Sequence, residues 1–182
     1  MPALSLVGAS KRPAFEMRTA QNGSDIYNMK MKGKEDPQPF AATPFDENLP
    51  TFSPDGRDIA YESDESGRKE IYLKPFPGPG PKFQVSTDGA RGPRWSRDGK
   101  ELFYASGERM MVVSVSETPG LRVSAPQLLF GGPFVFERAG NYDIAPDGKR
   151  FIMVQRTTDD RATQLLRVVL NWSSDLKKRF AR

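Results

Sequence analysis

The 182-residue sequence contains no cysteine and no histidine. Without cysteine, disulfide bonds and thiolate metal sites are excluded. Without histidine, the chain lacks the commonest general base and the commonest side-chain metal ligand, and every Ser–His–Asp or Cys–His triad is excluded. An enzyme built on this chain would have to work with carboxylates, lysine, arginine or tyrosine.

Long hydrophobic runs are also missing. No apolar run approaches the roughly 18 residues that a membrane-spanning helix needs. The first residues make a poor signal peptide, because only a few apolar residues precede Lys11 and Arg12 and no basic segment comes before them. The sequence therefore predicts a soluble chain with no membrane span and no export signal of its own, and it leaves the cellular compartment open.

The net charge of +4 is unevenly distributed. Residues 1–34 hold six Lys and Arg against two acidic residues, and residues 161–182 hold six against one. The long middle part, residues 35–160, holds fifteen against twenty and is mildly acidic. Because this middle part would have to carry any extended basic face, we expect no nucleic acid among the partners.

Glycine and proline, by contrast, are abundant, with sixteen of each. They lie between short apolar runs, which is the composition of many strands joined by many turns. Hydrophobic residues make up 37% of the chain and charged residues 27%, so we expect a folded domain rather than a disordered chain.

A repeat organises the sequence. Three segments share one pattern, at 50–61, 93–104 and 142–153, and each contains an Asp-Gly pair after a short strand that ends in Phe52, Trp95 or Ile144. The Asp-Gly pairs are spaced by 43 and 49 residues, close to the ~40–45 residues of one propeller blade. Glycine supplies the positive φ that tight hairpin turns require. The pattern predicts an all-β propeller of about four four-stranded antiparallel blades.

The blade boundaries follow from this phase. We expect blades at approximately 1–49, 50–92, 93–132 and 140–172, followed by a basic tail or short helix at 173–182. The segment Ala3–Val7 has the composition of a strand and could complete either the first or the last blade. In the second case it would close a ring of four blades. Otherwise the chain forms part of a larger ring that a second copy completes.

The repeat resembles that of TolB-like, WD-repeat-like bacterial propellers, on motifs such as Pro50-Thr-Phe-Ser-Pro-Asp-Gly56 and Ile71-Tyr72. Residues Tyr72–Gly80 and Val168–Trp172 are similar to the final blades of propellers fused to serine/threonine kinases, although no kinase motif is present here. The resemblance implies a protein-interaction or sensing module. If this chain is part of a longer parent, the resemblance also implies a periplasmic or extracytoplasmic place.

The recurring aspartates Asp55, Asp98 and Asp147 have two interpretations. They could form a ring of metal-binding carboxylates, or each could accept backbone hydrogen bonds within its own turn. We expect turn chemistry, because the turns belong to separate blades, and we therefore predict neither a metal nor any other cofactor.

Binding residues are expected in the loops that join one blade to the next, which share a face with the loops between the second and third strands of each blade. The candidates are Asp46, Glu47, Asp88, Arg91, Phe134, Phe136, Glu137 and Arg138. The three phenylalanines of 130–136 have two readings. They form an exposed aromatic contact patch, or Phe130 completes a strand while the others plug the neighbouring blade.

The function predicted from these features is that of a protein-interaction or scaffold module without catalysis of its own. Its partner would be another protein or a second copy of the chain, as in a homodimer. The alternative is a propeller hydrolase that cleaves glycosides or esters with Asp and Glu in the axial funnel. No spacing singles out a catalytic pair, so catalytic residues stay unknown.

Overall fold

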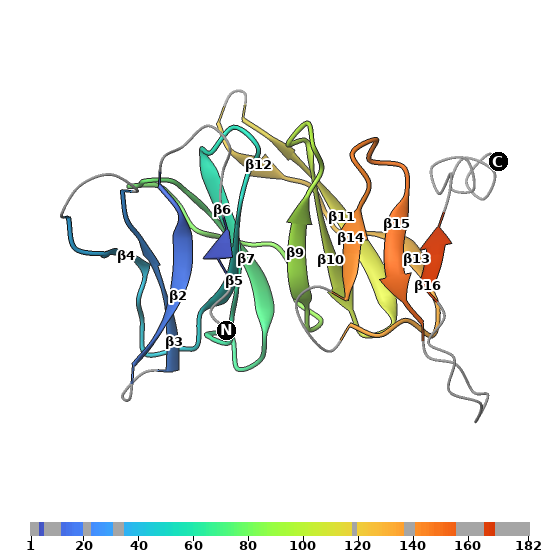
Figure 1. Ribbon diagram of the computed structural model, residues 1–182, viewed down its shortest axis with the longest axis horizontal. Helices are drawn as coiled ribbons and strands as arrows, with labels where there is room; N and C mark the ends of the chain where they lie inside the picture. Colours follow the sequence, from blue (N-terminus) through green and yellow to red (C-terminus); the bar gives the residue numbers. More distant parts are fainter. Residues whose placement is uncertain are drawn as a thin grey trace.

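The structure is a computed structural model that describes residues 4–5, 12–19, 23–30, 35–117, 120–136, 141–155 and 166–169. Within these residues the chain is all-β, with sixteen strands in four antiparallel sheets (Figure 1). None of these residues forms a helix that is long and apolar enough to cross a membrane. The expected class, a β-propeller of four consecutive blades, is confirmed.

Each sheet is formed by strands that follow one another along the chain. Blade 1 contains β1 (Leu4–Ser5), β2 (Ala14–Thr19), β3 (Gly23–Asn28) and β4 (Gln38–Ala41). Blade 2 contains β5 (Asn48–Phe52), β6 (Asp58–Ser63), β7 (Glu70–Pro75) and β8 (Phe83–Gln84). Blade 3 contains β9 (Arg91–Trp95), β10 (Glu101–Ser106) and β11 (Arg109–Ser116), with β12 (Arg122–Val123) and β13 (Gln127–Gly131) both paired to β11. Blade 4 contains β14 (Tyr142–Ile144), β15 (Phe151–Val154) and β16 (Leu166–Val169).

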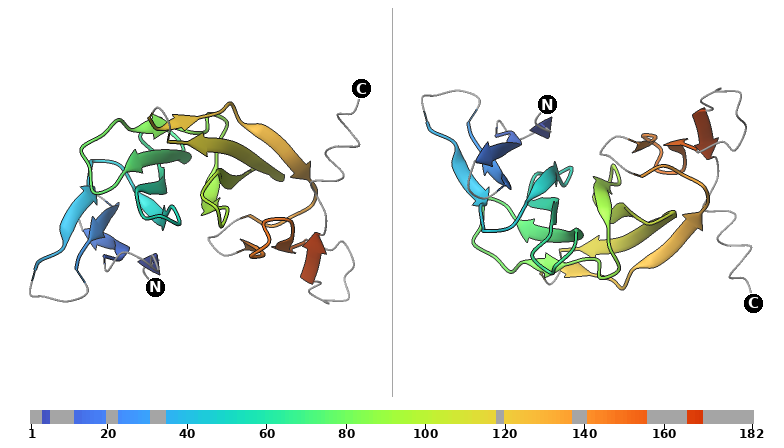
Figure 2. Two further views of the ribbon diagram at one scale, coloured as in Figure 1. Left: turned by 90° about the horizontal axis from the view of Figure 1, so that it is seen from above. Right: turned by 90° about the horizontal axis from the view of Figure 1, so that it is seen from below.

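The four blades stand around an open arc, with the first strand of each sheet toward its inside (Figure 2). The register pairs Leu4 with Phe15 and Ser5 with Ala14, so the N-terminal strand completes blade 1. It does not close a ring by joining blade 4, whose described sheet has three strands. The arc therefore ends in one unpaired blade face on each side. The tail at 173–182 lies outside the described residues.

The Asp-Gly turns are held by their own aspartates. Asp55, Asp98 and Asp147 each accept a hydrogen bond through Oδ1 from the backbone N–H two residues later, at 3.1, 3.1 and 2.9 Å. These bonds contribute to a lowered pKa at all three carboxyls. The glycine that follows each aspartate has a φ between +65° and +75°, which only glycine adopts at low cost. The expected turn chemistry is confirmed.

The core lies between blades. We call the face of a blade toward the next blade its forward face and the opposite face its rear face. Side chains alternate between the two along each strand. The forward face of each blade packs on the rear face of its successor in three clusters: Ala14 and Ile26 against Ile59, Tyr61 and Tyr72; Ala60, Ile71 and Leu73 against Leu102 and Tyr104; and Phe103, Met110 and Val112 against Phe151 and Met153.

Two of the three junctions also contain a carboxylate link. Oε1 of Glu16 in blade 1 accepts a hydrogen bond from the backbone N–H of Leu49 in blade 2, at 2.7 Å. Oε1 of Glu62 in blade 2 accepts one from Gly92 in blade 3, at 2.6 Å. Leu49 and Gly92 have φ values of 53° and 65°, so both junctions use the same left-handed backbone. At the third junction, the position that corresponds to Glu62 holds Ala105. The two positions correspond because Ala105 pairs with Met110 in the β10–β11 register as Glu62 pairs with Ile71 in the β6–β7 register.

Replacing Glu62 with alanine should destabilise the fold, because the buried N–H of Gly92 would lose its acceptor. We expect a loss of about 1–3 kcal/mol in the free energy of unfolding, measured by urea denaturation. Glu62→Gln keeps an acceptor oxygen for this N–H, so it should lose distinctly less stability than the alanine variant. Equal stability of the alanine variant and the parent protein would show that the link is dispensable.

Asp58 should make stability depend on pH. Its side chain is buried at the start of β6, and this burial, with Glu117 and Asp55 nearby, raises its pKa to about 6. The folded state therefore holds the proton more tightly than the unfolded chain, and stability is lost as the pH rises from about 4 to about 6. Between pH 4 and pH 7, the free energy of unfolding of Asp58→Asn should rise by about 1–2 kcal/mol relative to that of the parent.

Asp55→Asn provides the matched control for Asp58, because the pKa of Asp55 is lowered and not raised. This variant should lose stability relative to the parent as the pH rises toward about 4, the opposite sign, and should keep a constant difference at higher pH. Urea denaturation of the three proteins from about pH 2 to about pH 7 measures both effects. Parallel profiles for Asp58→Asn and the parent would contradict the assignment.

Candidate functional site

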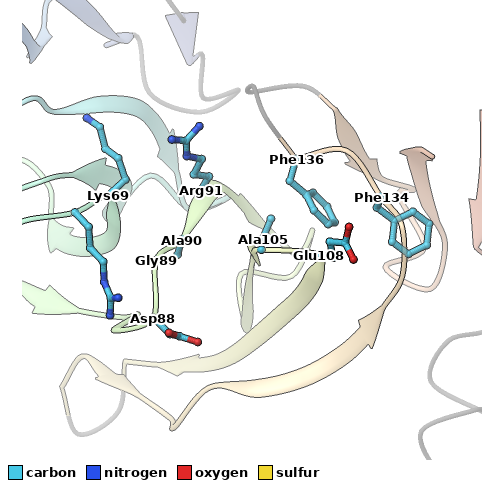
Figure 3. A pocket seen from close by; sticks show the side chains of 11 residues that line it. Lys69, Asp88, Gly89, Ala90, Arg91, Ala105, Glu108, Phe134 and Phe136 are labelled. Atoms are coloured by element: carbon cyan, nitrogen blue, oxygen red, sulfur yellow. The ribbon is translucent and has the colours of Figure 1, made fainter. Parts of the chain in front are cut away.

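A pocket of about 430 Å³ lies on the face formed by the blade-to-blade loops and the loops between second and third strands. Residues from blades 2 and 3 and from the loop leading to blade 4 line it (Figure 3). Cationic side chains lie on one side of the pocket, aromatic ones on the other. The lining residues are Arg68, Lys69, Asp88, Gly89, Ala90, Arg91, Ala105, Gly107, Glu108, Phe134 and Phe136.

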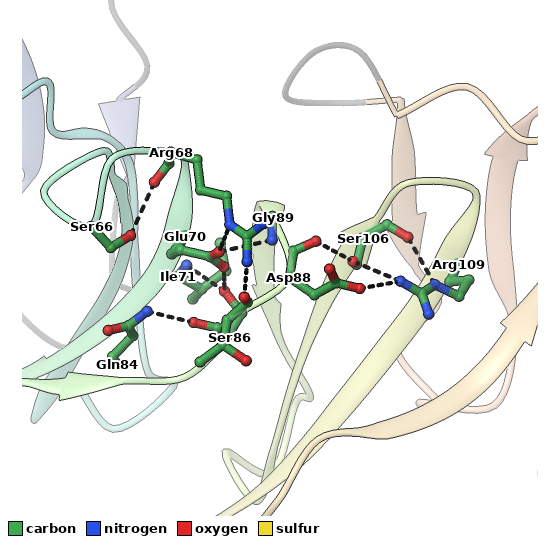
Figure 4. Close-up of polar contacts among 11 residues, drawn as sticks. Ser66, Arg68, Glu70, Ile71, Gln84, Ser86, Asp88, Gly89, Ser106 and Arg109 are labelled. Atoms are coloured by element: carbon green, nitrogen blue, oxygen red, sulfur yellow. Dashed lines mark hydrogen bonds and ion pairs between the residues drawn. The ribbon is translucent and has the colours of Figure 1, made fainter.

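The position of Arg68 is fixed by Glu70, a fully buried carboxylate at the start of β7. Arg68 Nε donates to Glu70 Oε1 at 2.8 Å, and the backbone N–H of Gly89 donates to the same oxygen at 2.8 Å (Figure 4). Ser86 Oγ donates to Glu70 Oε2 at 2.5 Å. The guanidinium also contacts the carbonyl of Thr87. One buried carboxylate thus holds both the arginine and the loop that forms this wall of the pocket.

Asp88 lies on the rim of the pocket. Its carboxylate pairs with Arg109 at 2.6 Å, and its carbonyl oxygen accepts a hydrogen bond from Ser106 Oγ at 3.2 Å. The Asp88 side chain is 73% exposed, so the ion pair is strongly screened and contributes little to stability. The pairing nevertheless ties the blade 2–blade 3 loop to β11. A second loop-face candidate, Arg91, is exposed at the beginning of β9 and also lines the pocket.

The aromatic wall comes from the segment that leads into blade 4. Phe134 is 9% exposed, and its ring centroid lies 5.7 Å from that of Phe130 and 6.2 Å from that of Phe136. The Phe136 ring in turn contacts Tyr142, centroid to centroid at 6.0 Å. The structure supports the second interpretation of this segment, in which these side chains are part of the core. Phe130 lies in β13, and the rings of Phe134 and Phe136 pack on blade 4. Phe134 and Phe136 still reach the pocket wall.

Asp46 and Glu47 lie at the preceding junction and do not line the pocket. Asp46 accepts hydrogen bonds from the backbone N–H of Ser24 at 2.9 Å and from Lys69 Nζ at 2.6 Å. Glu47 is 1% exposed. Its carboxyl accepts hydrogen bonds from Thr43 Oγ1 and from Ser63 Oγ, and burial raises its pKa. Glu47, a predicted binding residue of the loop face, thus has its carboxyl in internal hydrogen bonds.

The remaining candidates, Glu137 and Arg138, lie outside the described residues. Conversely, sequence reasoning did not select Arg68, Lys69 and Glu108, although all three line the pocket. The sequence did contain a signal for their position, since these residues lie in or beside the turns between the second and third strands of blades 2 and 3. Those turns were expected to share the binding face, but no residue in them differs in type from an ordinary solvated turn.

The lining combines charged side chains with aromatic rings. Its cations are Arg68, Lys69 and Arg91, and its carboxylates are Asp88 and Glu108. Because Lys69 Nζ is bound to the carboxylate of Asp46, the two arginines supply the positive charge for a ligand carboxylate beside the phenylalanine rings.

Comparison with known proteins identifies the fold. No protein-family model and no curated protein sequence matches the chain. Among solved structures, TolB from Acinetobacter baumannii is similar with a TM-score of 0.68 at 19% identity, over 93% of this chain and 40% of that one. An oligogalacturonate lyase in complex with manganese has a TM-score of 0.65 at 13% identity, over 94% and 50%. The β-propeller domain of the Trilobed protease from Pyrococcus furiosus has a TM-score of 0.58 at 13% identity, over 92% and 53%.

These similarities establish a TolB-like β-propeller fold and, at such identities, the fold alone. The chain spans about half the length of the solved structures it matches. Its four blades are therefore an incomplete propeller by comparison with them. The closer resemblance to kinase-fused propellers is not tested by these structures and stays a prediction.

The Glu70 network yields a prediction about the pocket wall. Glu70→Gln should leave Ser86 and Gly89 hydrogen-bonded but remove the ion pair with Arg68, so the loop at 86–89 and the guanidinium become more mobile. We expect faster amide hydrogen exchange at Gly89, with the amides of β10 unchanged. Exchange at Gly89 that stays as slow as in the parent would show that the order of this loop does not depend on the ion pair between Glu70 and Arg68.

Proposed function

We propose that this chain is a protein-interaction module without catalysis of its own, and that its pocket binds an acidic segment of a partner protein. We propose further that a second copy of the chain is one of its partners. The observation that carries the first proposal is the convergence of loops from blades 2 and 3 and of the segment leading into blade 4 on one open pocket, with an arginine held in place by buried Glu70.

An acidic segment fits the distribution of charge in the pocket. Arg91 is exposed and Arg68 keeps more than half of its side chain accessible, so both can meet an incoming carboxylate. Arginine presents a planar fork of donors that binds carboxylates in a bidentate way. Phe134 and Phe136 form an apolar wall opposite these cations, where a neighbouring hydrophobic side chain of the same segment can lie.

A hydrolase with carboxylates in the axial funnel is the alternative function. Propellers with this fold include proteins described as an oligogalacturonate lyase and a protease, so the architecture is compatible with catalysis. No observation on the described residues singles out a pair of carboxylates for it. We therefore treat turnover of ester or glycoside substrates as a result that would overturn the binding proposal.

Arg91→Glu should abolish the selection of acidic peptides from a random peptide display library, because it places a like charge in the pocket. Peptides selected by the parent should bind this variant at least about tenfold more weakly, as measured by fluorescence anisotropy. The parent affinity should also fall as salt is added.

Arg97→Glu is the matched control. It makes the same change of charge at an exposed residue in the Asp-Gly turn of blade 3, between first and second strands and so at the other end of the blade. It should retain parent affinity. The proposal is refuted if the library yields no acidic peptides, if both variants weaken binding equally, or if the parent turns over ester or glycoside substrates.

A further inference from the structure

The pocket on the loop face carries charges of both signs on opposite sides. Arg91 lies on one side of it, and the rings of Phe134 and Phe136 lie on the other (Figure 3). Glu108 also lines the pocket, on the same side as the two rings. A ligand that fills the pocket therefore meets positive charge at one end and a carboxylate with two aromatic rings at the other.

The two carboxylates of the lining differ in how their charge is balanced. Asp88 is paired with Arg109 at 2.6 Å. Glu108 is exposed, and none of the ion pairs among the described residues includes it. Its charge repels a ligand that carries only acidic groups and attracts a ligand that brings a cation to this side of the pocket.

The backbone holds Glu108 next to the aromatic side of the pocket. Glu108 lies in the tight turn between β10 and β11, where the register pairs Ser106 with Arg109. Its carbonyl oxygen accepts a hydrogen bond from the backbone N–H of Gly132 at 3.1 Å. The ring of Phe134 packs on Gly132 so closely that a Cβ there would lie 2.8 Å from it. The turn and the aromatic segment therefore form one wall, which we call the aromatic wall.

The groups of the aromatic wall suit a basic side chain. The carboxylate of Glu108 accepts hydrogen bonds from an ammonium or guanidinium group, and the face of an aromatic ring attracts the same cation. Phe136 is partly exposed at this wall. A lysine or arginine can lay its methylene groups along such a ring while its charged end reaches the carboxylate. A plain hydrophobic side chain would leave the charge of Glu108 unbalanced.

Tyr142, a buried side chain of blade 4, connects the two sides of the pocket. Its hydroxyl donates a hydrogen bond to the carbonyl oxygen of Gly92, the residue after Arg91. Its ring contacts that of Phe136, with the centroids 6.0 Å apart. Oε1 of Glu62 accepts a hydrogen bond from the N–H of the same glycine at 2.6 Å. This network through three blades fixes the separation between the backbone of the arginine and the aromatic wall, so a ligand has to match that separation.

We propose that the pocket binds a peptide segment in which an acidic and a basic residue stand at one fixed spacing. The acidic side chain binds to the arginines, and the basic side chain lies against the phenylalanine rings with its charge on Glu108. The inference rests on the proposed binding of an acidic segment and names the second charge that this segment has to carry.

A reversal of charge tests the role of Glu108. Peptides that the parent selects from the display library should contain a lysine or arginine at a constant distance from the acidic residue. Changing this basic residue to glutamate should weaken binding to the parent at least about tenfold, as measured by fluorescence anisotropy. Glu108→Lys should bind the glutamate form of the peptide more tightly than the original form.

Asp36→Lys is the matched control for Glu108→Lys. It makes the same change of charge at an exposed residue between β3 and β4, at the end of blade 1 away from the loop face. It should keep the preference of the parent for the original peptide.

Tyr142→Phe tests the fixed spacing, because it removes the hydroxyl and retains the ring. The parent should discriminate at least about tenfold between the selected peptide and one whose two charges are one residue further apart. The variant should discriminate distinctly less. This ratio of affinities does not change when part of the protein is merely unfolded, so it separates a loss of positioning from a loss of stability.

Failure of this inference and failure of the proposed function give different results. The inference alone is overturned by selected acidic peptides without a constant basic residue, by a Glu108→Lys variant that keeps the preference of the parent, or by unchanged discrimination in Tyr142→Phe. A library that yields no acidic peptides would overturn the proposed binding and the inference together.

Discussion

The burial of each blade's forward face against the rear face of its successor is the interaction on which this structure depends. Neither face of a blade is polar in its middle, so a single sheet could not stay folded in water. Successive blades remove this surface by the same arrangement, with small or aliphatic side chains such as Ala60 and Ile71 packed against rings such as Tyr104. The Glu16–Leu49 and Glu62–Gly92 hydrogen bonds then fix how far one blade is rotated against the next.

The binding face follows from this packing. Because blades 2, 3 and 4 are packed together, the loops between them hold constant positions, and the pocket lies where loops of blades 2 and 3 meet the segment that leads into blade 4. Its details come from exceptions to the repeat. Ala105 replaces the linking glutamate at the third junction, and the residue lines the pocket. The longer connection between blades 3 and 4 supplies Phe134 and Phe136. The repeat therefore builds the scaffold, and departures from the repeat build the site.

The sequence predicted the fold well because its signals are local. The Asp-Gly turns and the strand alternation depend on neighbouring residues only, and the β5–β6, β9–β10 and β14–β15 hairpins lie where the repeat placed them. The pairing of Leu4 and Ser5 with β2 rather than with blade 4 could not be read from sequence, because it depends on the curvature of the whole arc.

The site was predicted only in part, for similar reasons. Asp88, Arg91, Phe134 and Phe136 line the pocket as loop-face residues, but Glu47 is internal because Thr43 and Ser63 hold its carboxyl. Nothing in the residue type distinguishes a buried loop glutamate from a solvated one. The forward and rear faces could likewise be assigned only after the structure had shown which side of β15 meets blade 3.

The central claim is that each blade is stable only while its forward face lies on the rear face of its successor. Amide hydrogen exchange of the unmodified chain at increasing urea concentrations tests this most directly, because it reports the stability of each blade separately. We predict that the amides of β6 and β10, the central strands of blades 2 and 3, converge on one common free energy of unfolding. Blades that unfold independently, each with its own transition, would contradict the claim.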